Sequence, residues 1–161
     1  MKPTLIVASA AIFLSLALAG TASAQTSFQA SITAHGPLPK PCPNNEFLCG
    51  TAKIENHGPA TWTFTITSLT IQGTCANYQA AVTFELADSS TLVLDENGTA
   101  CGPGNSALAA ANSYGTPTYA TGDWSVQSAD GQFAGIAGAG TDALHIAGAN
   151  ASGSYTGLLS Q

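Results

Sequence analysis

The sequence predicts an all-β fold: a single antiparallel β-barrel of about eight short strands, with a two-sheet β-sandwich as the alternative. Apolar and polar residues alternate over short segments, which is the period of a half-buried strand. Residues typical of turns, above all Gly, Asp, Asn and Pro, separate these segments. No segment beyond residue 24 repeats its apolar residues with the period of a helix, so strands are expected throughout.

The first 24 residues have the composition of a cleaved secretory signal peptide. Lys2 supplies a positive start, residues 5–19 are apolar or small, and Ala22-Ser23-Ala24 offers a small-residue cleavage site. The apolar run is shorter than the about 20 residues that a membrane-spanning helix needs. We therefore expect residues 1–24 to be removed, and residues 25–161 to form one exported domain, periplasmic or extracellular, without a membrane span.

The exported part is acidic but carries little charge. It has two lysines, Lys40 and Lys53, no arginine, and nine carboxylates. Binding to nucleic acid or to an anionic membrane needs clustered Lys and Arg, so we expect neither partner. The sequence does not identify a protein partner.

Four cysteines lie in the exported part, and an even number in an oxidising compartment predicts two disulfides. Of the three pairings we favour the sequential one, because each pair then brackets a turn-rich segment or a hairpin. The expected bonds are Cys42–Cys49 and Cys75–Cys101. A zinc site is disfavoured because no Cys-x-x-Cys spacing occurs, and we expect no metal and no cofactor.

In the first half of the domain, predicted strands alternate with loops. Residues 27–34 and 51–56 read as strands, and between them the segment 35–50 holds four prolines and the first cysteine pair, which predicts a pinned loop. Residues 60–72 form the clearest strand, but the apolar phase slips near Thr67-Ser68. A bulge or sharp bend is needed there to keep the apolar side chains inward.

The second half continues the pattern. Residues 78–86 and the segment around Leu92 and Leu94 read as a hairpin, followed by a turn at Glu96-Asn97-Gly98. Residues 102–117 are rich in Gly, Ala and Ser and predict a surface loop. The remaining expected strands are 122–128, 132–140, 142–147 and 154–159, with turns at 130–131 and 148–153.

One segment resembles a known family. Residues 122–141 (GDWSVQSADGQFAGIAGAGT) contain a strand, a tight turn and a Gly-x-Phe-Ala-Gly stretch with further glycines at Gly138 and Gly140. This is similar to the Gly-x-Phe strand of the dirigent and allene oxide cyclase-like barrels of the calycin type, which include exported bacterial members. The resemblance implies an eight-stranded barrel whose interior is filled or holds one small ligand. None of that family's site residues can be matched here.

Six apolar residues fall on the inferred inward faces of the strands. Buried aromatic side chains usually pack a core, and the alternative is that some of them line a ligand cavity. These residues are Trp62, Phe64, Val82, Phe84, Trp124 and Phe133.

The titratable residues offer no clear catalytic set. His35 and His57 sit beside glycine in loops, His145 falls on an outward strand face, and Glu55 with His57 lacks a third metal ligand. Paired carboxylates would suit a glycosidase, but most candidates flank turns, where Asp caps the backbone. The candidates are Glu85, Asp88, Asp95, Glu96, Asp123, Asp130 and Asp142.

We therefore expect an exported barrel that binds rather than catalyses, either holding a small apolar molecule or acting as an envelope interaction module. The alternative is a cyclase or isomerase that confines a small apolar molecule inside the barrel. Catalytic residues stay unassigned.

Overall fold

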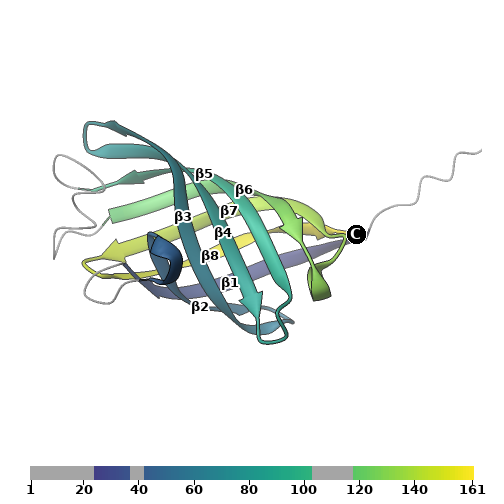
Figure 1. Cartoon of the computed structure of the whole chain (residues 1–161). Coiled ribbons are helices and arrows are strands. Elements are labelled where there is room, and N and C mark those ends of the chain that lie inside the picture. Colours follow the sequence, from purple (N-terminus) through teal and green to yellow (C-terminus); the bar gives the residue numbers. More distant parts are fainter. Residues whose placement is uncertain (1–23, 37–41, 103–117) are drawn as a thin grey trace, which may run out of the picture.

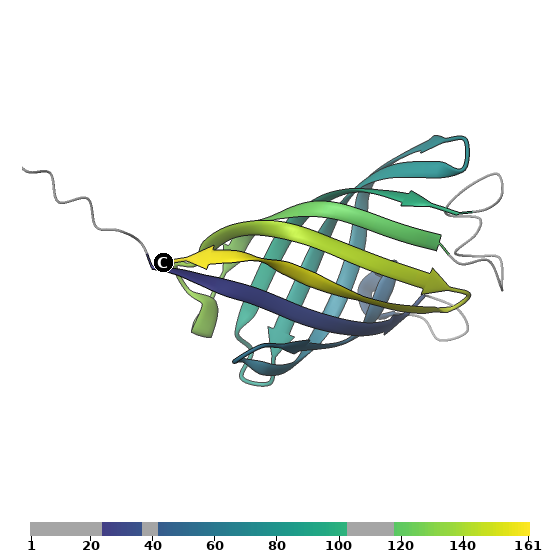
Figure 2. The same ribbon diagram turned by 180° about the vertical axis from the view of Figure 1, so that it is seen from behind.

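The computed structural model describes residues 24–36, 42–102 and 118–161. Eight strands each pair antiparallel with the next along the chain, and the last pairs with the first, so the sheet closes into a barrel (Figures 1 and 2). The predicted all-β barrel is confirmed. The strands are β1 (Gln25–His35), β2 (Leu48–Ile54), β3 (Gly58–Gln72), β4 (Cys75–Leu86), β5 (Thr91–Cys101), β6 (Thr118–Ala129), β7 (Ala137–Ala147) and β8 (Asn150–Ser160).

Alternation of buried and exposed residues explains why these segments form strands. In β1, for example, every second residue from Phe28 to Ala34 is buried, while the residues between them face solvent. Closure gives each strand two paired neighbours, so the barrel has no free sheet edge. The inward side chains of all eight strands form one hydrophobic core.

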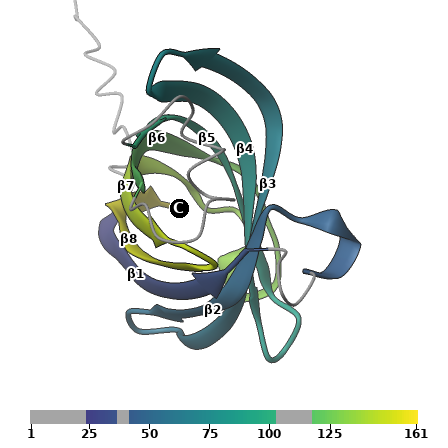
Figure 3. The ribbon, with the colours of Figure 1, turned by 90° about the vertical axis from the view of Figure 1, so that its left-hand side faces the viewer.

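The two ends of the barrel differ. The disulfide end carries both disulfides, the β3–β4 hairpin and the β7–β8 turn (Figure 3). The opposite end carries the C-terminus and the 3-10 turn η2 (Gly131–Phe133). Phe133 is fully buried there and packs against the ring of His57, with ring centroids 4.7 Å apart. We call this the Phe133 end.

The bend expected near Thr67-Ser68 is present as a register shift in the β3–β4 pairing. Ile66 pairs with Ala80, whereas Ser68 pairs with Gln79, so one residue of β3 is skipped. The shift returns Leu69 to the face of its buried partner Tyr78. Beyond it the hairpin splays away from the barrel at the disulfide end (Figures 1 and 3).

Three expectations about turns and strands in the second half of the domain differ from the structure. Glu96-Asn97-Gly98 lies within β5. Gly98 is opposite Tyr78 in the ladder, and its lack of a side chain makes room for the tyrosine ring instead of forming a turn. The separate strands expected at 132–140 and 142–147 are instead the 3-10 turn η2 followed by the single strand β7. The turn expected over 148–153 is shorter, because β8 already begins at Asn150.

Both disulfides have the expected pairing, with Cα–Cα distances of 5.6 Å for Cys42–Cys49 and 4.1 Å for Cys75–Cys101. They indicate a non-reducing environment. In the described part of the chain, no helix is long and apolar enough to cross a membrane. The expected signal peptide lies outside the described residues, except for Ala24, as do residues 37–41 of the expected loop 35–50 and residues 103–117 of the expected loop 102–117. Within the described part of the first loop, the chain forms the 3-10 turn η1 (Pro43–Asn45), and residues 48–50 belong to strand β2 rather than to the loop.

Candidate functional site

Four polar residues lie inside the barrel among apolar side chains. Glu96 and Asp142 are 1% and 5% exposed, and Tyr78 and Tyr155 are also buried. Tyr78, Asp142 and Tyr155 lie in one row across the sheet. The row consists of successive strand partners from β4 to β8, namely Tyr78, Gly98, Gly122, Asp142 and Tyr155. Glu96 lies two residues before Gly98, on the same face of β5. We call Tyr78, Glu96, Asp142 and Tyr155 the carboxyl cluster.

Glu96 accepts a hydrogen bond from each tyrosine. The phenol of Tyr78 donates to Oε1 at 2.7 Å, and the phenol of Tyr155 donates to Oε2 at 2.9 Å. Asp142 is different, because neither of its buried oxygens has a hydrogen-bond partner of good geometry among the described residues. The Asp142 carboxyl nevertheless lies beside the carboxyl of Glu96, an arrangement in which the two buried groups can share a proton.

Two glycines make room for the carboxyl cluster. A methyl group at Gly122 would lie 2.6 Å from Oδ1 of Asp142 and 3.2 Å from Cγ of Glu96. A methyl group at Gly98 would overlap the ring of Tyr78. Since both distances at Gly122 are shorter than ordinary contacts, the missing side chains are what allow polar groups to fill this level of the barrel.

No cation balances the cluster within residues 24–36, 42–102 and 118–161, whose single lysine, Lys53, is exposed on β2. Burial raises the pKa of Asp142 to about 8, and the charge of Glu96 adds to the rise. Burial also raises the pKa of Glu96, although hydrogen bonds from both tyrosines oppose it. The pKa of each tyrosine is raised by burial and by the carboxyls, so both phenols stay protonated. The carboxyl pair therefore retains a proton at neutral pH.

An apolar cavity of about 30 Å³ lies next to the carboxyl cluster, toward the disulfide end. Its walls include Ala76, Ala100 and Ala120, which are partners across neighbouring strands. Each lies two residues along its strand from the row that contains Tyr78. These small side chains leave the space. Tyr78 lines the cavity and donates to Glu96, so its ring separates the cavity from the carboxyls.

The cavity wall continues outward along the splayed hairpin. Ile66 and Leu69 line the cavity, and Leu69 is 37% exposed. Ile71, two residues further on the same face of β3, is 52% exposed. Apolar side chains therefore run from the surface of the hairpin to the ring of Tyr78. We call Ile66, Leu69 and Ile71 the apolar rim.

The six predicted core or cavity residues are all buried. Of these, Phe64 lines the cavity, and the other five pack elsewhere in the interior. Trp124 donates its indole N–H to the carbonyl oxygen of Thr141 at 3.0 Å, and Phe84 packs edge-on against Tyr155. The barrel between the cluster and the Phe133 end is thus filled by side chains.

Of the seven candidate carboxylates, Glu96 and Asp142 face inward and the other five are exposed. The sequence pattern alone does not separate this inward pair from the other five candidates. A signal was present, because Glu96 continues the buried phase of Leu92 and Leu94, and Asp142 shares a phase with the buried Leu144.

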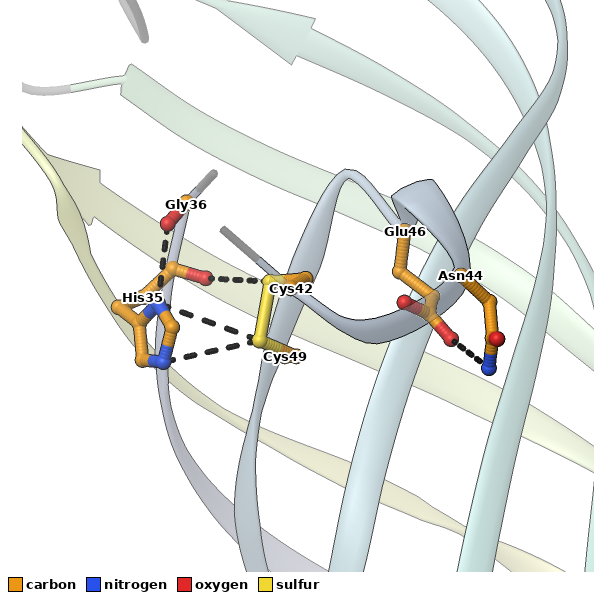
Figure 4. Close-up of a disulfide and its surroundings, with 6 residues drawn as sticks. All are labelled: His35, Gly36, Cys42, Asn44, Glu46 and Cys49. Atoms are coloured by element: carbon orange, nitrogen blue, oxygen red, sulfur yellow. Dashed lines mark hydrogen bonds between the residues drawn. A yellow bond between two sulfur atoms is a disulfide. The ribbon is translucent and has the colours of Figure 1, made fainter. Parts of the chain in front are cut away.

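The three histidines lie in three separate places. The Nε2 atom of His35 is 3.6 Å from Sγ of Cys49 (Figure 4), but that sulfur is bonded to Cys42 and offers no thiolate to a metal. His57 packs on Phe133 at the opposite end. His145 stacks on the exposed Tyr119 on the outer face, as its strand phase predicted.

No family model, no curated protein and no solved structure matches the chain.

Proposed function

We propose that this protein is an exported binding protein that holds a small, mainly apolar molecule at the disulfide end of its barrel. The observation that carries this proposal is the continuous apolar wall from the exposed rim to Tyr78. Ligand sites are typically concave, mostly apolar and equipped with a few polar groups. The wall has this apolar character, and the carboxyl cluster lies behind the ring of Tyr78.

The size of the cavity limits how the molecule binds. About 30 Å³ is the volume of one water molecule, so only an end group of the ligand fits inside. The apolar body of the ligand then packs against Leu69 and Ile71 on the splayed hairpin. Removing this exposed apolar surface from water contributes about 25 cal/mol for each Å² buried.

Export is supported by two features. Two disulfides are typical of proteins that fold in an oxidising compartment. The composition of residues 1–24 is that of a signal peptide. The absence of arginine from the whole chain argues against phosphate-bearing partners such as nucleic acid.

The test is a calorimetric titration of the exported, disulfide-bonded protein with 1-octanol. We expect saturable binding with one molecule per chain. The double variant Leu69→Ser and Ile71→Ser removes the apolar rim and should weaken binding at least tenfold, because two contact side chains are lost. Leu158→Ser is the matched control, since Leu158 is 51% exposed on β8 and does not line the cavity.

The proposal is wrong if 1-octanol does not bind to the wild type. It is also wrong if the Leu69→Ser and Ile71→Ser double variant binds 1-octanol as tightly as the Leu158→Ser control does. A loss of binding accompanied by unfolding of the rim variant would be recognised by circular dichroism. In that case the single variant Leu69→Ser provides the comparison.

A second candidate is the confinement-type cyclase or isomerase. It is favoured by Asp142, whose raised pKa keeps a buried acid protonated near neutral pH. The filled interior weighs against it, because the ring of Tyr78 separates the cavity from both carboxyls. Turnover that is lost in Asp142→Asn while ligand binding persists would support this candidate.

A further inference from the structure

A polar groove lies on the outer face of the barrel, on the opposite side of the sheet from the apolar cavity. It has a volume of about 780 Å³, which is within the range of ligand pockets, and it extends from β3 to β7. One wall is the part of the β3–β4 hairpin beyond the register shift at Ile66 and Ser68, where the hairpin splays away from the barrel (Figure 3).

Two rows of exposed polar side chains line the groove. In each row the residues are partners across neighbouring strands, so their side chains stand about 4.8 Å apart. The first row consists of Ser68, Gln79, Asn97, Asp123 and Thr141. The second row consists of Thr70, Asn77, Thr99 and Thr121.

The chemistry of these side chains selects the kind of ligand. Each hydroxyl and each amide can both donate and accept a hydrogen bond. The hydroxyl of Thr99 donates to Oδ1 of Asn77 at 2.9 Å, which orients that amide within the groove. A ligand with many hydroxyl groups can pair with both rows, whereas an apolar ligand would leave these side chains without partners.

Charge favours a neutral ligand. Asp123 is the only ionisable side chain of the two rows. Lys53, the single lysine within the described ranges, lies on β2 and outside the groove. An anionic ligand would therefore meet a carboxylate with no cation to offset the repulsion. A single exposed carboxylate also attracts a cationic ligand only weakly.

An exposed aromatic side chain extends the same face toward the disulfide end. Tyr119 lies two residues before Thr121 on β6 and is 62% exposed. Its ring stacks on the ring of its strand partner His145, with centroids 4.8 Å apart. The stacking holds the tyrosine ring as a flat apolar surface, on which the C–H face of a sugar ring can pack.

From these observations we infer that the outer groove binds a neutral oligosaccharide. The sugar hydroxyl groups hydrogen-bond to the two rows, and one sugar ring packs on Tyr119. The row from Ser68 to Thr141 crosses five strands, or about 19 Å, which suits a chain of sugars better than a single sugar. This site is separate from the apolar cavity and does not rest on the proposed function.

The experiment titrates the disulfide-bonded protein by calorimetry at pH 7 with four neutral hexasaccharides: cellohexaose, maltohexaose, mannohexaose and N-acetylchitohexaose. We expect at least one of them to bind with a Kd below about 1 mM. Hexagalacturonate carries a carboxylate on every sugar. It should bind at least tenfold more weakly than that neutral hexasaccharide, because Asp123 repels it.

Variants then locate the bound hexasaccharide. The double variant Gln79→Ala and Asn97→Ala should weaken binding about tenfold, because two amides of the first row are lost. Tyr119→Ala should weaken binding about threefold to tenfold. Gln29→Ala is the matched control and should stay within about twofold of the wild type, since Gln29 is exposed on β1 and does not line the groove.

The inference is overturned if none of the four neutral hexasaccharides binds, or if hexagalacturonate binds as tightly as they do. Equal binding to the wild type and to the Gln79→Ala and Asn97→Ala double variant would overturn it as well. The probe comparison uses the wild type alone, so it is decisive even if a variant does not fold. None of these outcomes bears on the apolar cavity, which is tested separately with 1-octanol.

Discussion

The phenol of Tyr155 donates a hydrogen bond to Oε2 of Glu96 at 2.9 Å, although the two residues lie on β8 and β5, three strands apart around the barrel. Tyr78 on β4 holds the other oxygen of the same carboxyl group. Glu96 thus links three strands through the interior. The carboxyl cluster is a structural element of the barrel as well as the polar neighbour of the cavity.

Replacing Tyr155 with Phe should therefore destabilise the fold. The change leaves Oε2 of Glu96 buried without a donor, which costs about 1–3 kcal/mol. Urea denaturation measures the loss. Tyr119→Phe is the control, because Tyr119 is 62% exposed and should change stability by less than about 0.5 kcal/mol. Equal effects of the two substitutions would contradict the role given to Tyr155.

The free energy of unfolding should depend on the protonation of Asp142. Its pKa is about 8 in the folded protein against 3.8 in the unfolded chain, so the folded state binds the proton more tightly. Stability is then highest below about pH 4 for this group and falls as the pH rises to about 8. The loss should be on the order of a few kcal/mol.

Asp142→Asn should reduce that decline without abolishing it, because the amide carries no charge at any pH whereas the pKa of the buried Glu96 is also raised. Denaturation midpoints measured from pH 4 to pH 9 provide the comparison. The control is Asp123→Asn, which changes an exposed carboxylate of β6 and should leave the decline intact. A decline of the same size in Asp142→Asn would show that other groups cause it.

Gly98 should tolerate no side chain. A methyl group there would overlap the ring of Tyr78, so we expect Gly98→Ala to cost about 1–3 kcal/mol in thermal or urea unfolding. Gly36→Ala is the control, since its added methyl would lie 3.9 Å from Cδ2 of Leu48, an ordinary contact. Combining Gly98→Ala with Tyr78→Leu should cost less than the sum of the two single changes. Additive effects would mean that the overlap is not the cause.

The two disulfides should contribute unequally to stability. In the chain-entropy account, loss of Cys75–Cys101, which closes 26 residues, costs about 3.5 kcal/mol, whereas loss of Cys42–Cys49, which closes seven, costs about 2.5 kcal/mol. Paired Cys→Ala variants measured in urea test the order. A larger loss for the Cys42–Cys49 pair would show that local packing outweighs loop length.

Much of the fold could be predicted because the alternation of apolar residues reports directly on a half-buried strand. The bulge near Thr67-Ser68 followed from the same rule, since a change of phase must be absorbed by the backbone. The disulfide pairing followed from local spacing. A second register shift, in the β5–β6 pairing, skips Gln127 of β6 opposite Val93 and Leu94, and it was not predicted from the sequence.

The carboxyl cluster was harder to foresee. Asp and Glu near glycine are typical of turns, which holds for Asp130 but not for Glu96 or Asp142. Their burial depends on contacts between strands that are far apart in sequence, and on the space left by Gly98 and Gly122.

The most direct test of the account is a methyl NMR titration of the disulfide-bonded protein with 1-octanol. We predict saturable shifts for methyl groups that line the cavity, with Leu158 on the outer face unchanged. The cavity methyl groups belong to Ile66, Leu69, Leu144 and Ile146. Saturable shifts confined to other methyl groups, or no saturable shift at all, would contradict the claim that this end of the barrel binds a small apolar molecule.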